Sequence, residues 1–234
     1  MKLLSTKAVA FIGVFAAFHA TLYLISPPVL WRNWAIYLSP IEGMVLGPWA
    51  GFMAALIGST IGRVVLPSPL WMFGIVAEPL SVMSAGFLTR GKWQPVIALY
   101  VGMLAAYFIS PMGQSLPLWP MLDTIVAVCL VYPAAKVSRN LFGEEVNPFL
   151  PVSLVLVSFV TVAADGLTRV FLFIPVGLYS SVLGLSPAVT AVTFVAGGID
   201  SFIEDGLVVL VTALVGVPIL LALRNVLNLK KPLS

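Results

Sequence analysis

Apolar runs nearly as long as a bilayer is thick recur along most of this chain, and no other feature restricts its fold as strongly. Hydrophobic residues make up 60% of the sequence and charged residues only 9%, against about 25% charged in an average soluble domain. A soluble fold of 234 residues could not cover this much apolar surface. We therefore expect an integral protein of the cell membrane. The apolar runs cover residues 8–25, 36–46, 49–66, 70–88, 95–109, 121–135, 151–174 and 188–223.

A backbone that crosses lipid must satisfy its polar groups internally, which favours helices. We therefore expect an all-α, polytopic membrane helical bundle that forms a single domain over residues 1–234. The run 188–223 is too long for one perpendicular helix, since about 20 residues span the core. Gly197-Gly198 is the natural break, and we expect a short lead-in followed by a span from about Ile199.

The stretch from Ile41 to Ser81 organises the bundle. An apolar run meets Gly47-Pro48 and resumes as a second run of small residues, which predicts a short two-pass hairpin over residues 36–66. With this hairpin, every cluster of Lys and Arg in the connections falls on one side of the membrane. The positive-inside rule then favours about eight spans, with both termini cytoplasmic. These clusters are Lys2/Lys7, Arg90/Lys92, Lys136/Arg139 and Arg224/Lys230/Lys231.

Other classes of protein are disfavoured by what the sequence lacks. The basic residues lie in short connections and form no nucleic-acid footprint. Cys129 is the one cysteine, and the single histidine, His19, lies in an apolar run, so we expect no disulfide, metal site or cofactor. The N-terminal run could be a signal peptide, but no Ala-x-Ala site precedes Ser26, and we expect a first span instead.

Ionisable residues inside the apolar runs are the candidate functional groups, because lipid does not tolerate an unpaired charge. Asp165 and Arg169 are one helical turn apart and can pair, and Arg63 with Glu78 is a second possible pair. Each pair is either structural or part of an outward-facing pocket. The candidate substrate-binding residues are Arg63, Trp71, Glu78, Gln114, Asp123, Asp165 and Arg169.

Two enzyme classes share fragments with this chain. Asp165-Gly166-x-x-Arg169 matches part of the CDP-alcohol phosphotransferase signature, but Val162, Ser180 and Ser181 stand where further acidic residues belong. Asp165 and Asp200 could form an aspartyl pair sharing one proton. The sequence around them departs from the elements that such proteases carry. We expect no enzymatic activity.

The first 140 residues resemble the substrate-binding S component of energy-coupling-factor vitamin transporters. The resemblance lies in a small-residue face on the first helix, a short second helix and the turn Leu46-Gly47-Pro48-x-Ala50-Gly51. A small-residue third helix follows, and then Glu78 ahead of Ser84-Ala85-Gly86. The core 1–142 would be S-component-like, and 149–224 would add helices beyond the usual six spans.

The resemblance implies a bundle that binds a vitamin or similar small molecule on its outer side. Release inward would need a transmembrane coupling subunit and two ATPase subunits on other chains, and this sequence has no Gly-x-x-x-x-Gly-Lys-[Ser/Thr] loop of its own. The family's docking face corresponds here to Ala10, Gly13, Ala17 and Ala20. From the residues alone, this face packs either within the chain or against a partner.

Two other functions remain open. An ion-coupled secondary transporter or channel acting alone would use Glu78, Asp165 and Asp200 as proton or cation sites. A scaffold subunit of a larger membrane complex is the third possibility.

Overall fold

The structure, a computed structural model, describes residues 6–25, 33–67, 70–139, 141 and 149–227. Within these ranges every regular element is a helix, which confirms the all-α prediction. The elements are α1 (Thr6–Leu24), α2 (Trp34–Leu46), α3 (Pro48–Val65), α4 (Trp71–Leu88), α5 (Gln94–Ile109), α6 (Pro111–Ser115), the 3₁₀ helix η1 (Trp119–Met121), α7 (Leu122–Ser138), α8 (Leu150–Phe173), α9 (Leu178–Ser181) and α10 (Pro187–Leu227).

Five helices in the described ranges are long and apolar enough to cross a membrane: α3, α4, η1 with α7, α8 and α10. Helices α1, α2 and α5 are also apolar but shorter. The protein is therefore a helical membrane bundle.

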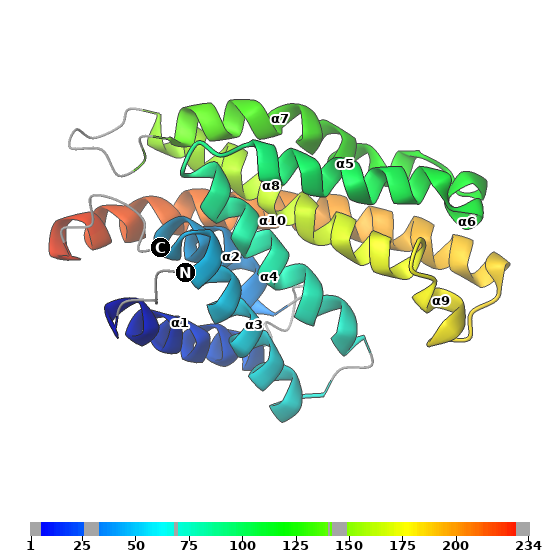
Figure 1. Ribbon diagram of the computed structural model, residues 1–234, viewed down its shortest axis with the longest axis horizontal. Coiled ribbons are helices and arrows are strands. Elements are labelled where there is room, and N and C mark those ends of the chain that lie inside the picture. The colour runs from blue at the N-terminus through cyan, green and yellow to red at the C-terminus, as the bar shows by residue number, and fades with distance from the viewer. Residues whose placement is uncertain (1–5, 26–32, 68–69, 140, 142–148, 228–234) are drawn as a thin grey trace.

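Helix α8 is the centre of the bundle, because it contacts α2, α4, α5, α7 and α10. Figure 1 shows α5, α7, α8 and α10 running close to the longest axis of the molecule, with α3 and α4 crossing obliquely below them. Helix α1 lies at the edge, where it packs mainly against α3. The helices of the first part of the chain thus pack against the long helices through α2 and α4.

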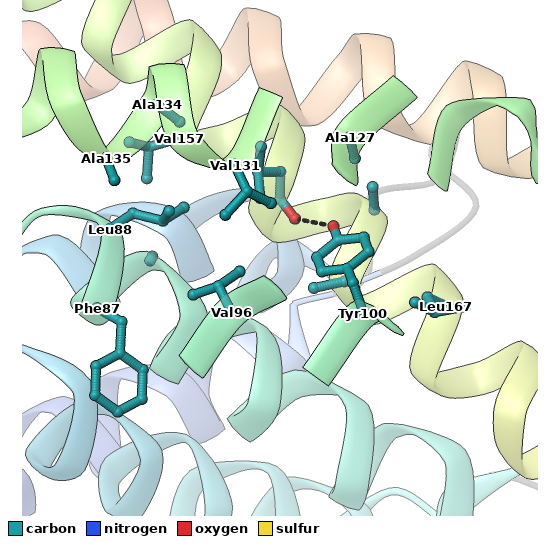
Figure 2. Packing of buried hydrophobic residues seen from close by; sticks show 14 of the residues in the cluster. Phe87, Leu88, Val96, Tyr100, Ala127, Val131, Ala134, Ala135, Val157 and Leu167 are labelled. Atoms are coloured by element: carbon teal, nitrogen blue, oxygen red, sulfur yellow. Dashed lines mark hydrogen bonds between the residues drawn. The ribbon is translucent and has the colours of Figure 1, made fainter. Parts of the chain in front are cut away.

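Small and branched side chains pack where α4, α5, α7 and α8 meet. Figure 2 shows Leu88, Val96, Val131 and Leu167 filling this region. Tyr100 is fully buried, and its hydroxyl donates to the carbonyl of Val160 over 2.6 Å. The hydroxyl of Tyr100 is therefore satisfied within the core.

The chain turns sharply at Gly47, as the sequence indicates. Gly47 has a φ of 80°, which favours glycine, and Pro48 opens α3 at a position where its missing N–H costs nothing. A Cβ added to Gly51 would lie 3.5 Å from the Gly43 Cα. In one straight helix those residues would be about 12 Å apart. The two helices therefore fold back on each other at this turn.

The small residues of α3 form the surface on which α1 packs. A Cβ added at Gly58 would lie 2.7 Å from the Ala16 carbonyl oxygen, and one at Gly62 would overlap the Tyr23 ring. Buried Ala54 and Ala55 continue the same region of α3. Close backbone approach of this kind brings the side chains of α1 into the interior.

Helix α10 contradicts the break expected at Gly197-Gly198. It continues from Pro187 to Leu227 as one helix of 41 residues. Gly198 serves close packing instead, because a Cβ there would lie 2.9 Å from the Pro120 Cα. Two glycines cost a helix only about 1 kcal/mol each relative to alanine, and a long apolar helix can absorb that.

Candidate functional site

Glu78 lies at the centre of a buried group of charged side chains. Its carboxylate accepts hydrogen bonds from both Nη atoms of Arg63 on α3, with 3.0 Å between Nη1 and Oε2. Nε2 of His19 on α1 lies 3.4 Å from the same Oε2, and Nη2 of Arg169 on α8 lies 3.6 Å from Oε1. Glu78 is only 1% exposed. One carboxylate thus joins four helices.

The neighbours of Arg63 fix its position. Nη1 also donates to the carbonyl oxygen of Ser59 over 3.2 Å, and the guanidinium carbon lies 4.7 Å from the centroid of the Tyr23 ring. Gly74, one turn before Glu78, leaves the room that the guanidinium occupies, since a Cβ there would overlap it. The space for this ion pair is therefore encoded in α4 itself.

His19 extends the group to a fifth helix. Its Nδ1 lies 2.8 Å from Oε2 of Glu42 on α2, while its Nε2 faces Glu78. His19 is 1% exposed and Glu42 is 7% exposed. The imidazole therefore bridges two carboxylates inside the protein.

Asp165 and Arg169 complete the group from α8. Arg169 donates through Nε to Asp165 Oδ2 over 2.6 Å, and through Nη2 to Oδ1 over 3.3 Å. Both ion pairs that the sequence suggests, Arg63 with Glu78 and Asp165 with Arg169, are confirmed.

Together these side chains form what we call the charge network: His19, Glu42, Arg63, Glu78, Asp165 and Arg169. Three carboxylates face two guanidinium groups, and a proton on His19 would supply the third positive charge. A lone charge near the centre of a membrane helix costs about 2.5–3.5 kcal/mol on insertion scales. Mutual pairing offsets this cost, and it makes the position of each charge depend on the others.

A cavity of about 410 Å³ lies beside the network. We call it the large cavity. Its wall combines one guanidinium and three carboxyl groups with hydroxyl groups and three phenylalanine rings. The charged and hydroxyl residues are Asp123, Thr124, Arg169, Thr193, Asp200, Ser201 and Glu204, and the aromatic ones are Phe73, Phe173 and Phe194. Arg169 belongs to both the cavity wall and the charge network.

Asp123 is held by hydroxyl and amide donors. Its Oδ1 accepts from the backbone N–H of Thr124 over 2.6 Å, and its Oδ2 accepts from Ser201 Oγ of α10 over 2.7 Å. It also lies in the first turn of α7, where the helix dipole favours a negative charge. The contact of Gly198 with Pro120 brings α10 close enough for the Ser201 bond.

The structure separates the seven candidate substrate-binding residues into three groups. Asp123 and Arg169 line the large cavity. Arg63, Glu78 and Asp165 lie in the charge network, linked to the cavity through Arg169. Trp71 and Gln114 are exposed and do not line the cavity; Gln114 donates to the carbonyl of Phe108.

The candidate docking face on α1 is largely uncovered. Ala10, Gly13 and Ala17 are exposed, and a Cβ added to Gly13 would meet nothing within 4 Å. Ala20 is buried at 7% exposure. Three of the four small residues therefore point away from the bundle, and packing within the chain uses a different face of α1.

Sequence reasoning gave no role to several residues of the site. His19 was set aside for lacking metal-ligand neighbours, and Glu42 received no role, although an ionisable residue inside an apolar helix is itself a signal. The phenylalanines of the cavity gave no signal, because such residues are common in any membrane helix. Within the described ranges, no three His, Cys, Asp or Glu side chains are placed to hold a metal ion.

Comparison with known proteins adds a similarity but no activity. The chain is 30% identical over 156 residues to an uncharacterised protein of Methanocaldococcus jannaschii. The match covers 63% of this chain and 52% of that protein, so the chain spans about half the length of this relative. No family model matches the chain. No solved structure matches it either.

Proposed function

We propose that this chain is a membrane-embedded substrate-binding subunit for uptake of a vitamin or similar small molecule, with the large cavity as its substrate site. The observation that carries the proposal is a cavity of about 410 Å³ in which Arg169 and Asp123 face three aromatic rings. Ligand pockets of about 300–1,000 Å³ with apolar walls and a few placed polar groups are typical of small-molecule sites.

The proposed topology has eight spans with both termini cytoplasmic. It would put the starts of α4, α7 and α10 and the end of α8 on the outer side. These are the segments that supply the lining of the large cavity, including Phe73, Asp123, Arg169 and Ser201. Three of these helices run inward from this end and α8 runs toward it, yet all four contribute lining residues to one cavity, which supports an opening toward the exterior.

Energy would come from other chains, as in the transporters that the first 140 residues resemble. The proposed complex contains a transmembrane coupling subunit and two ATPase subunits. The exposure of Ala10, Gly13 and Ala17 supports α1 as the surface that meets the coupling subunit. Small residues allow the close helix approach that such docking in lipid requires.

Ligand binding by the purified full chain tests the substrate site. A panel of radiolabelled water-soluble vitamins is measured without an ion gradient, in the wild-type chain and in Asp123→Asn. We expect the variant to bind the selected vitamin about tenfold more weakly, a change of about 1.4 kcal/mol, because a charge-assisted contact is lost. Gln114→Ala, outside the cavity, is the matched control and should bind normally. If Asp123→Asn binds the vitamin as tightly as the wild-type chain does, the large cavity is not the substrate site.

An ion-coupled transporter acting alone is the second candidate, and one observation favours it. His19 lies between Glu42 and Glu78, an arrangement that suits proton uptake and release within a membrane. Proteoliposomes containing only this chain separate the two functions. Substrate accumulation driven by an imposed proton gradient would support the second candidate. Accumulation only after ATPase and coupling subunits are added would support the first.

A further inference from the structure

A second cavity of about 250 Å³ lies between α1, α2 and the end of α10, and we call it the small cavity. None of the described residues that line it also lines the large cavity. Among the described residues that line it, only His19 and Glu42 are polar. The others are Val14, Phe15, Phe18, Leu22, Ala35, Leu38, Ile41, Val45, Ile219 and Leu223.

One oxygen of the carboxylate that lines this cavity is unsatisfied. Glu42 Oε2 is held by His19 Nδ1, but Glu42 Oε1 is buried and has no hydrogen-bond partner among the described residues. Glu42 is 7% exposed, so bulk water does not solvate this oxygen. A buried acceptor oxygen without a donor is unfavourable, and in a native site such an oxygen calls for a partner.

We propose that the small cavity is a second binding site, for a small protonated amine with an apolar body. An ammonium group donates hydrogen bonds and carries the charge that complements Glu42. The apolar walls contact the rest of the molecule. An anion is disfavoured, because His19, the one side chain with N–H groups among the described lining residues, already has both ring nitrogens directed at carboxylates.

The surroundings of the cavity limit the size and route of this ligand. Its volume is below the range of about 300–1,000 Å³ found for drug-sized ligands, which favours a compact molecule. Val14 and Phe18 line the cavity and are 66% and 50% exposed on α1. An amine that partitions into the bilayer would therefore enter the cavity laterally from the lipid, past these two side chains, to reach Glu42.

The test uses radiolabelled phenethylamine, a protonated amine on one aromatic ring, and the full chain in lipid nanodiscs. Empty nanodiscs correct for partitioning into lipid. We expect saturable binding, and competition by unlabelled phenethylamine at least tenfold stronger than by 2-phenylethanol, its uncharged analogue. Glu42→Gln should weaken binding at least tenfold. Asp123→Asn, in the large cavity, should leave it unchanged.

A second variant covers the case in which Glu42→Gln does not fold. Ile219→Trp adds bulk to the wall and leaves the charge network intact, and it should also reduce binding at least tenfold. Absence of saturable binding would overturn the proposal, as would equal competition by 2-phenylethanol. Unchanged affinity in a folded Glu42→Gln or Ile219→Trp variant, or loss of binding in Asp123→Asn, would overturn it as well.

Discussion

The two cavities differ in how their charged groups are supplied. In the large cavity, charged residues come from α7, α8 and α10, and neutral donors such as Ser201 hold Asp123 in place. In the small cavity, the polar groups are one histidine and one glutamate in an otherwise apolar wall. Yet both cavities contact the same charge network, through Arg169 in one and His19 with Glu42 in the other. A single set of buried ion pairs can thus serve two pockets of different polarity.

Removing the carboxylate of Glu78, at the centre of the charge network, should have the largest effect on stability and binding. Glu78→Ala leaves Arg63 buried without its main partner, so we expect the free energy of unfolding to fall by about 3–5 kcal/mol. Ligand binding should weaken in both cavities. Thermal unfolding of the purified protein, followed by circular dichroism, measures the first effect, and binding assays measure the second. Glu78→Gln, which keeps the shape, is the control and should lose less stability. Normal binding in either cavity of folded Glu78→Ala would show that the network does not join them.

Closing the space beside Arg63 gives an intermediate effect. Gly74→Ala places a methyl group where the guanidinium lies, and overpacking of this kind costs about 1–3 kcal/mol. The shift in thermal midpoint reports this cost. Gly102→Ala on α5 is the matched control, because a Cβ there meets nothing within 4 Å, and it should be neutral or slightly stabilising. Equal midpoints for the two variants would mean that Arg63 is not confined by α4.

Shortening one side chain in the wall of the small cavity should have the smallest effect on binding, and it should affect only that cavity. Phe18→Ala should weaken phenethylamine binding about fivefold, on the order of 1 kcal/mol, because apolar contact area is lost. Vitamin binding in the large cavity should not change. Phe108→Ala is the control, since Phe108 is similarly exposed on α5 and lines neither cavity. Weaker vitamin binding in Phe18→Ala would contradict the view that the two cavities are separate sites.

Most helices could be predicted from the sequence, because each membrane helix satisfies its own backbone hydrogen bonds. The runs 70–88 and 151–174 correspond to α4 (Trp71–Leu88) and α8 (Leu150–Phe173). Gly47-Pro48 identified the turn, because few other pairs both end one helix and start the next. The break predicted at Gly197-Gly198 was wrong, because a pair of glycines suits close helix packing as well as a helix end.

The candidate site was predictable only in part. Asp165 with Arg169 follows from helical spacing alone, and Arg63 with Glu78 follows from the proximity of consecutive helices. His19 with Glu42 does not follow, because that contact depends on how α1 settles against α2 and α3. The lining of the large cavity depends on α10 continuing as one helix past Gly198, which the sequence analysis did not expect.

The length of α10 has a mechanical consequence. Near its start, Gly198 borders the large cavity, and near its end, Ile219 borders the small one. The two positions are roughly 32 Å apart along one continuous helix. A tilt of this helix by about 10° around the midpoint between them would displace them by about 3 Å each in opposite directions. A tilt of α10 would therefore move the walls of the two cavities in opposite directions, and the position of the pivot would set the size of each displacement.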